Sequence, residues 1–169
     1  QGHLLDLLDS VYNAAYVEPW AQHYGNLFRS NLSSVTTYVR SRANFARNQL
    51  PAEIPFSIST NGGDDFTIDR SMVTLQGRGW VNVREIRLGN QTSSLPIAWK
   101  DAETWSTVIP INQGPNDVTL RAYDLKGTEV GLARIAITGT SDAILAGASN
   151  LIISEIHYHP SNHPDAEFI

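Results

Sequence analysis

Cysteine is absent from the 169 residues of this sequence. Disulfide bonds, catalytic thiols and thiolate metal ligands are therefore excluded, although a chain without disulfides is compatible with either side of a membrane. Charged residues are also few, at 17% of the chain, against ~25% in an average soluble domain. This low charge favours contacts with other protein domains.

Long hydrophobic runs are missing as well. No apolar stretch approaches the ~18 residues needed to cross a bilayer, so we expect no membrane insertion. The net charge is −5, and the basic residues are scattered except for Arg40, Arg42 and Arg47, which are interpreted as a solvated helix face. A nucleic-acid partner needs clustered basic residues, so none is expected.

Residues 1–50 place apolar side chains at the three- and four-residue spacing of amphipathic helices. Three stripes result: Leu4, Leu5, Leu8, Val11, Tyr12 and Ala15; Trp20, Tyr24, Leu27 and Phe28; and Val35, Val39, Ala43, Ala46 and Leu50. Pro19 predicts a break and a restart, because proline suits the first turn of a helix. About 50 residues rarely form a stable core alone. These helices are therefore expected to pack on the following domain or on a surface outside this chain.

Residues 51–141 change to an alternating apolar and polar pattern. Strand-length runs separated by turn residues occur here: IPFSIST, SMVTLQG, WVNVREIRLG, LPIAWK, TWSTVIPI, NDVTLRAYD and EVGLARIAITG. Their spacing of about 10–12 residues is typical of an immunoglobulin-like β-sandwich. We therefore predict a mainly β chain, with an immunoglobulin-like antiparallel β-sandwich preceded by a short helical segment.

The run WVNVREIRLG changes the parity of its apolar residues. Val81 and Val83 share one parity, whereas Ile86 and Leu88 share the other. A bulge at residues 84–85 would return all four side chains to the core, because a bulge inserts one extra residue into a strand.

The C-terminal run LIISEIHYHPSNHPDAEFI contains a candidate metal site. Alternate residues of a strand share a face, so Glu155, His157 and His159 would lie about 6–7 Å apart. Two imidazoles and a carboxylate form a ligand set for zinc or another transition metal. In the alternative interpretation, these side chains face water while Ile152, Ile156 and Tyr158 pack on a core.

The run NGGDDFTID offers a second metal candidate. Asp64 and Asp65 follow two glycines, and carboxylate oxygens on a glycine loop can bind calcium. The spacing does not fit the twelve-residue calcium loop, so a hydrated turn between two strands is the other interpretation.

Three tryptophans of the predicted sandwich are candidate ligand-binding residues. If Trp80, Trp99 and Trp105 share an exposed face, they would stack on sugar rings. If they are buried, they contribute packing energy to the core or to the junction between helices and sandwich.

Catalytic motifs are not found in this sequence. No serine lies in a Gly-x-Ser-x-Gly elbow, and QGRGW lacks the spacing of a phosphate-binding loop. We therefore predict no catalytic residue, no cofactor and no enzymatic activity for this chain.

Three segments resemble parts of known families. HLLDLLDSVYNAAYVEPWAQHY and YVRSRANFARNQLP, within residues 1–50, resemble the last helices of bacterial spore-coat-protein-H-like (CotH) kinase domains. PFSISTNGGDDFTIDRSMVTLQGRGWVNVREIRL, within residues 51–141, resembles the immunoglobulin-like module that follows such kinases. LIISEIHYHPSNHPDAEFI, within residues 142–169, is similar to the opening of a lamin-tail domain, so this last part is expected to be a linker and truncated first strands.

The order of these segments implies part of a larger extracellular or cell-surface bacterial protein. Nothing in the chain matches the nucleotide-binding residues of such kinases. The expected function is a non-catalytic structural and interaction module, a spacer whose partners are the neighbouring domains. The alternative is a carbohydrate- or calcium-binding module, with a carbohydrate or surface protein as partner. Self-association through an exposed strand or the helices is a further expectation.

Overall fold

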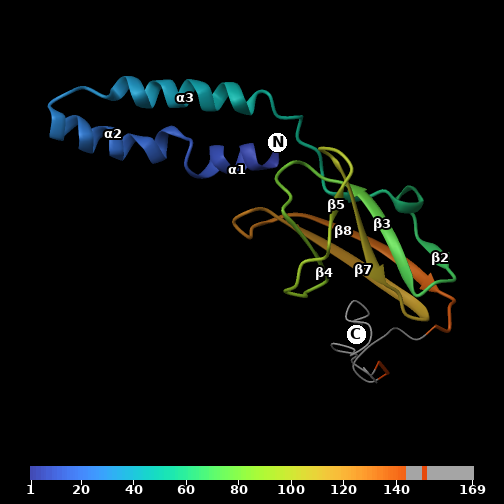
Figure 1. Ribbon diagram of the computed structural model, residues 1–169. Coiled ribbons are helices and arrows are strands. Elements are labelled where there is room, and N and C mark those ends of the chain that lie inside the picture. The colour runs from blue at the N-terminus through green and yellow to red at the C-terminus, as the bar shows by residue number, and fades with distance from the viewer. Residues whose placement is uncertain (144–149, 152–169) are drawn as a thin grey trace, which may run out of the picture.

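The computed structural model describes residues 1–143 and 150–151, and three helices precede a two-sheet sandwich within them (Figure 1). The helices are α1 (Gly2–Ser10), α2 (Ala14–Phe28) and α3 (Ser33–Arg47). A short 3-10 helix, η1, covers Thr60–Gly63, and the strands are β1 (Ser57–Ile58), β2 (Phe66–Ile68), β3 (Met72–Arg78), β4 (Glu85–Leu88), β5 (Ala98–Trp99), β6 (Thr104–Pro110), β7 (Gly114–Tyr123) and β8 (Glu129–Gly139).

The strands form two four-stranded sheets, in the orders β1-β3-β6-β5 and β2-β8-β7-β4. All pairs are antiparallel except β2 with β8, which is parallel. If the main strands are labelled A to G along the chain, one sheet has the order A-B-E-D and the other contains C, F and G, as in an immunoglobulin domain. The predicted fold, an immunoglobulin-like β-sandwich preceded by a short helical segment, is confirmed.

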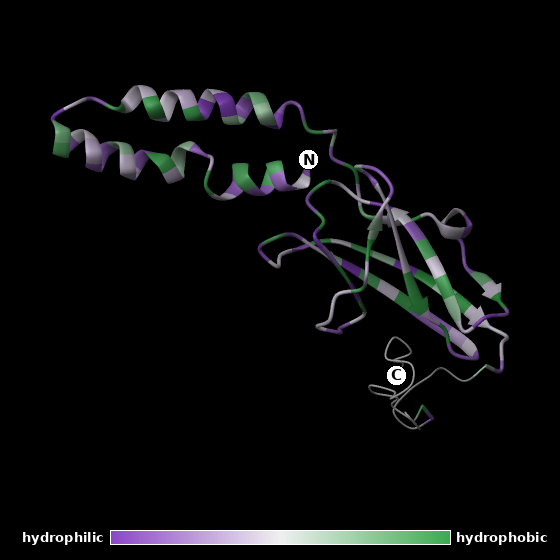
Figure 2. Ribbon diagram, in the orientation of Figure 1, coloured by the Kyte–Doolittle hydropathy of each residue, from purple (hydrophilic) through white to green (hydrophobic). Residues whose placement is uncertain are grey.

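The core lies between the two sheets and follows from the alternating pattern. Every second residue of β3 and β6 is buried, and Figure 2 shows the matching bands of hydropathy along the strands. Trp105 is completely buried, stacks on Phe56 with 5.3 Å between ring centroids, and donates its Nε1–H to the carbonyl of Arg78 at 3.0 Å. Gly77 lies opposite Trp105 in the register of β3 and β6.

The predicted bulge before β4 is a turn instead. The backbone N–H of Val83 donates to the carbonyl of Trp80 at 3.1 Å, and β4 begins only at Glu85. Val81, Val83 and Ile86 are buried on both sides of this turn. A turn changes the side-chain parity as a bulge would, without requiring a paired strand on either side of it.

The run NGGDDFTID contains both a turn and a strand. Asn61, Gly62 and Gly63 adopt positive φ values of 53°, 73° and 90°, a conformation that glycine permits at little cost. The predicted turn therefore exists, as η1. The parallel strand β2 begins after Asp64 and Asp65 and is not predicted by the sequence pattern.

The boundary between the first two helices is set by Asn13 and not by Pro19. The side chain of Asn13 accepts the backbone N–H of Tyr16 at 2.9 Å and so caps α2. Pro19 lies inside α2, where its missing N–H removes one helical hydrogen bond. The prediction of a restart at Pro19 is wrong, because the cap at Asn13 already begins the helix one and a half turns earlier.

Burial of the helices is limited to their shared faces. Leu5 and Leu8 of α1 and Val39 and Ala43 of α3 are buried. The second predicted stripe is exposed instead, at Trp20, Tyr24, Leu27 and Phe28. The reason is visible in Figure 1, in which the three helices form an arm: α2 and most of α3 extend away from the sandwich, and only α1 and the end of α3 approach it.

Candidate functional site

The junction between arm and sandwich is built around an ion pair between Asp6 of α1 and Arg84, which immediately precedes β4. Arg84 donates from Nε to Oδ2 of Asp6 at 2.8 Å and from Nη2 to Oδ1 at 2.9 Å. The side chain of Asp6 is only 16% exposed and that of Arg84 only 19%. This two-point geometry is the strong form of a charge-assisted hydrogen bond, because it fixes direction as well as distance.

The second side of the Arg84 guanidinium is held by the sandwich itself. Nη1 donates to the carbonyls of Val81 at 2.6 Å and Val83 at 3.0 Å. Gly2 of α1 lies so near that an added Cβ would be 2.6 Å from both Nη atoms. A larger residue at position 2 would displace the guanidinium, so the glycine permits this close approach.

Two further contacts stiffen the same region. Arg47 at the end of α3 donates to the carbonyl of Leu8 at 3.2 Å and to the carboxylate of Asp9 at 2.5 Å, and so links α3 to α1. Trp80 donates its Nε1–H to the carbonyl of Pro51 at 2.9 Å, which ties the segment after α3 to the sandwich. The arm is therefore joined to the sandwich at both of its connections.

A cavity of about 460 Å³ opens beside this ion pair, where the start of α1 meets the sandwich. Gly2 and His3 line it from the helix, and Val83, Trp99 and Asp101 line it from the sandwich. Trp99 is 38% exposed and offers part of its ring to the cavity. An aromatic face beside a carboxylate suits a ligand that has both an apolar face and hydrogen-bond donors.

The Asp101 carboxylate at this cavity is held ionised by its own turn. Its Oδ1 accepts the backbone N–H groups of Glu103 at 2.9 Å and Thr104 at 2.7 Å. These bonds lower the pKa of Asp101 below its usual value of 3.8, since they stabilise the charged form. The cavity is therefore lined by an ionised carboxylate at neutral pH, together with the guanidinium of Arg84.

The three predicted tryptophans do not share a face. Trp105 follows the buried alternative, because its ring packs between the sheets as part of the core. Trp80 is half-buried and its N–H is used at the junction. Of the three, Trp99 lies at the cavity.

The predicted aspartate pair is engaged in local structure. The Oδ1 atom of Asp65 accepts the backbone N–H of Ala136 at 2.8 Å, and Asn61 donates to the carbonyls of Asp64 and Asp65 at 3.1 and 3.2 Å. Within residues 1–143 and 150–151, no group of three or more histidine, aspartate or glutamate side chains is placed to hold a metal ion. Glu155, His157 and His159 lie outside the described residues, so that metal site stays a prediction.

Sequence reasoning missed Asp6 and Arg84, the residues that join the two parts. They are separated by 78 positions, and neither belongs to a motif. A single aspartate in a helix and a single arginine before a strand carry no signal of pairing. The change in the alternation of apolar residues after Val83 indicated an irregularity next to Arg84, but it did not indicate that Asp6 is the partner of Arg84.

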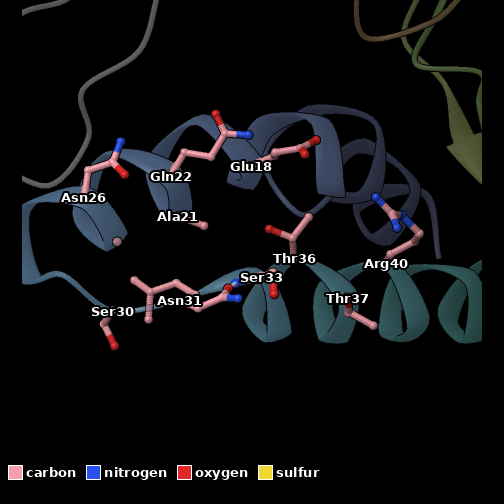
Figure 3. A pocket seen from close by; sticks show the side chains of 12 residues that line it. Glu18, Ala21, Gln22, Asn26, Ser30, Asn31, Ser33, Thr36, Thr37 and Arg40 are labelled. Carbon is pink, nitrogen blue, oxygen red and sulfur yellow. Dashed lines mark hydrogen bonds between the residues drawn. The ribbon is translucent and has the colours of Figure 1, made fainter.

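A second hollow lies between α2 and α3, with a volume of about 580 Å³ (Figure 3). Its lining is largely polar, and Figure 3 shows Ala21 of α2 and Thr36 of α3 turned toward each other across it. Glu18 and Arg40 line it from opposite helices. The facing sides of the arm thus carry mainly polar or small residues around this hollow and do not form a hydrophobic core there.

Two solved structures show a distant likeness to this chain. The sequence matches no protein-family model, and no curated protein matches it either. The fibronectin(III)-like modules of Clostridium thermocellum CbhA align over 51% of this chain and 96% of theirs, with 6% identity and a TM-score of 0.37. SGBP-B of the Bacteroides ovatus mixed-linkage glucan utilization locus, solved in complex with a mixed-linkage heptasaccharide, aligns over 67% of this chain, with 16% identity and a TM-score of 0.34. The aligned part is 29% of the SGBP-B chain, and the fold assignment here rests on the strand order of this chain itself.

Among the helices of the described residues, none is both long enough and apolar enough to cross a bilayer.

Proposed function

We propose that this chain is a non-catalytic interdomain module in which the sandwich holds the helical arm in a fixed orientation. The supporting observation is the Asp6–Arg84 pair, because it joins the arm to the sandwich with two directional bonds in a largely water-excluded place. Such a joint suits a spacer that sets the angle between its neighbours. A flexible linker would need no such contact.

The wider setting of the proposal comes from the resemblance of the segments. Residues 1–50 would be the end of a CotH-like kinase domain, residues 51–141 the spacer, and residues 142–169 the start of a lamin-tail-like domain. The whole protein would be extracellular or at the cell surface of a bacterium. The catalytic residues of the kinase would lie in other parts of that protein, and this chain would not bind nucleotide.

Limited proteolysis tests the joint. Glu53 is exposed between α3 and β1, so endoproteinase Glu-C can report how firmly this connection is held. We expect slow cleavage of the wild-type chain at Glu53 and faster cleavage of the Arg84→Met variant. The Arg121→Met variant is the matched control, since it removes an arginine that is paired with Glu129 between β7 and β8 and not with the helices.

The opposite result would refute the proposal. Rapid cleavage of the wild-type chain at Glu53, with the sandwich surviving alone and the helices lost, would show that the arm is not docked. Equal cleavage rates in the Arg84→Met and wild-type chains would show that the ion pair does not hold the joint.

A second candidate function is ligand binding at the cavity beside Trp99. It is favoured by the half-exposed indole next to the ionised Asp101 carboxylate. A neutral oligosaccharide has the matching chemistry, with an apolar ring face and hydroxyl donors. Titration with a glycan panel should change the tryptophan fluorescence of the wild-type chain and not of the Trp99→Phe variant. Unchanged fluorescence with every glycan would exclude carbohydrate binding at this cavity. Calcium binding at Asp64 and Asp65 is a separate alternative, and a melting temperature that does not change with calcium would exclude it.

A further inference from the structure

The outward face of α2 carries a continuous aromatic ladder. Trp20, Tyr24 and Phe28 follow one another at four-residue spacing, and adjacent ring centroids are 6.4 Å apart in both pairs, with nearly parallel planes. Their exposed fractions are 53%, 45% and 70%. Tyr16 and Leu27 extend the same face and are exposed to a similar degree.

This ladder lies on the side of α2 that is turned away from α3. Glu18, Gln22 and Asn26 line the hollow facing α3, and at 3.6 residues per turn the ladder residues lie about half a turn from them. The helix therefore directs its polar side at its neighbour and its apolar side at solvent. Figure 2 shows hydrophobic segments reaching the far tip of the arm.

The area of the ladder is large for a free surface. A buried aromatic side chain covers about 150–250 Å², so five half-exposed side chains leave about 500 Å² of apolar surface. That area is near the upper end for the largest patch of a typical monomer, about 300–600 Å². It would supply the apolar centre of a standard interface, which buries about 800 Å² on each partner.

We propose that the aromatic ladder is an interface between two copies of this chain, with α2 packed antiparallel on α2 of the second copy. Residues 19–28 contain no Asp, Glu, Lys or Arg, so two ladders meet without like-charge repulsion. The antiparallel arrangement also opposes the two helix dipoles. A twofold axis near Tyr24 would place Trp20 of one copy beside Phe28 of the other, so that the surface is complementary to itself.

The charge of the arm distinguishes this partner from other occupants. Residues 1–50 have four arginines and three acidic residues, a net charge of +1. Helices that lie on anionic membranes or bind nucleic acid carry many Lys and Arg residues on their polar face. The polar side of α2 offers Glu18, Gln22 and Asn26 instead. The inference does not depend on the Asp6–Arg84 joint, because the ladder lies on α2 whereas the joint links α1 to the residue before β4.

Analytical ultracentrifugation of the full chain, from micromolar to about 0.2 mM, tests the proposal. We expect the wild-type chain to reach the mass of two 18.6 kDa chains, and a Trp20→Ser and Phe28→Ser double variant to stay monomeric with at least a tenfold weaker association. The control is a Tyr38→Ser and Phe45→Ser double variant. It removes two equally exposed aromatic residues from α3 and should dimerise as the wild type does. Circular dichroism checks that all three chains keep their helices.

Other results would overturn the proposal. A monomeric wild-type chain over the whole range would show that the ladder does not bind a second copy, and so would loss of dimer in the α3 control. Binding of the monomer to vesicles of phosphatidylcholine, lost in the ladder variant, would identify a lipid surface as the occupant instead.

Discussion

Replacing Asp6 and Arg84 singly and together would measure how strongly the arm is coupled to the sandwich. The double-mutant cycle uses Asp6→Ala and Arg84→Met, because methionine keeps most of the apolar stem of arginine. Each single change leaves the other charge without its partner in a place where only 16% and 19% of the two side chains are exposed. The free energy of unfolding should therefore fall in both single variants.

The expected magnitude lies between two limits. A fully exposed ion pair contributes about 0–1 kcal/mol, whereas breaking a fully buried pair costs about 3–5 kcal/mol. With two bonds of 2.8 and 2.9 Å and about one sixth of each side chain exposed, we expect a coupling energy of about 2 kcal/mol, by comparison with those limits. Arg84→Met alone should cost about 3 kcal/mol, because the carbonyls of Val81 and Val83 also lose a donor.

Urea unfolding followed by circular dichroism and tryptophan fluorescence gives the four free energies. The control is the same cycle on Arg121 and Glu129, a pair at 2.8 Å with 27% and 38% of the side chains exposed. Its coupling should stay below about 1 kcal/mol. A coupling energy at Asp6–Arg84 no larger than in the control would refute the reasoning. If the wild-type helices unfold at a lower urea concentration than the one at which tryptophan fluorescence changes, the arm unfolds independently of the sandwich.

Three further changes test local features of the structure. Gly77→Ala places a Cβ 2.1 Å from the carbonyl oxygen of Ser57, so we expect about 3 kcal/mol of destabilisation from overpacking, and an unchanged melting temperature would contradict the close approach of β1 to β3. Asn13→Ala removes the cap bond to Tyr16 and should cost about 1 kcal/mol, whereas Asn13→Ser should retain most of the stability. Asp101→Asn keeps an acceptor and removes the charge. The pKa of Asp101 in the folded chain lies below 3.8, so the ionised carboxylate stabilises the folded wild type at pH values above 3.8. This stabilisation is lost as the pH falls through the folded pKa. A difference in melting temperature between wild type and Asp101→Asn that does not shrink on acidification would contradict this.

The strands of the core were predictable because burial on one face leaves a period of two in the sequence. Residues 72–78 and 104–110 alternate between buried and exposed positions in the structure, and most of the buried positions carry apolar residues in the sequence. Thr107, which is buried, and Val108, which is exposed, depart from the pattern. Gly62 and Gly63 marked the turn in the same local way. Short β2 was missed because three residues are too few to show a period, and its existence depends on the partner strand β8.

The helices show where a local pattern misleads. The spacing of Trp20, Tyr24 and Phe28 indicated an apolar face, which exists, and burial was inferred from it. Burial needs a surface within reach, and the position of the arm decides whether one is present. Pro19 was interpreted as a helix start although Asn13, an ordinary capping residue, lay six positions before it.

By itself, the sequence determined the fold class, the strands of the core and the exclusion of thiol chemistry, because these depend on composition and on short-range periodicity. The tertiary structure alone decided that Asp6 meets Arg84, that Trp105 is in the core while Trp99 lines a cavity, and that α2 presents its aromatic residues to solvent. These outcomes depend on contacts between residues far apart in the chain, and no local pattern specifies which distant residue a side chain will meet.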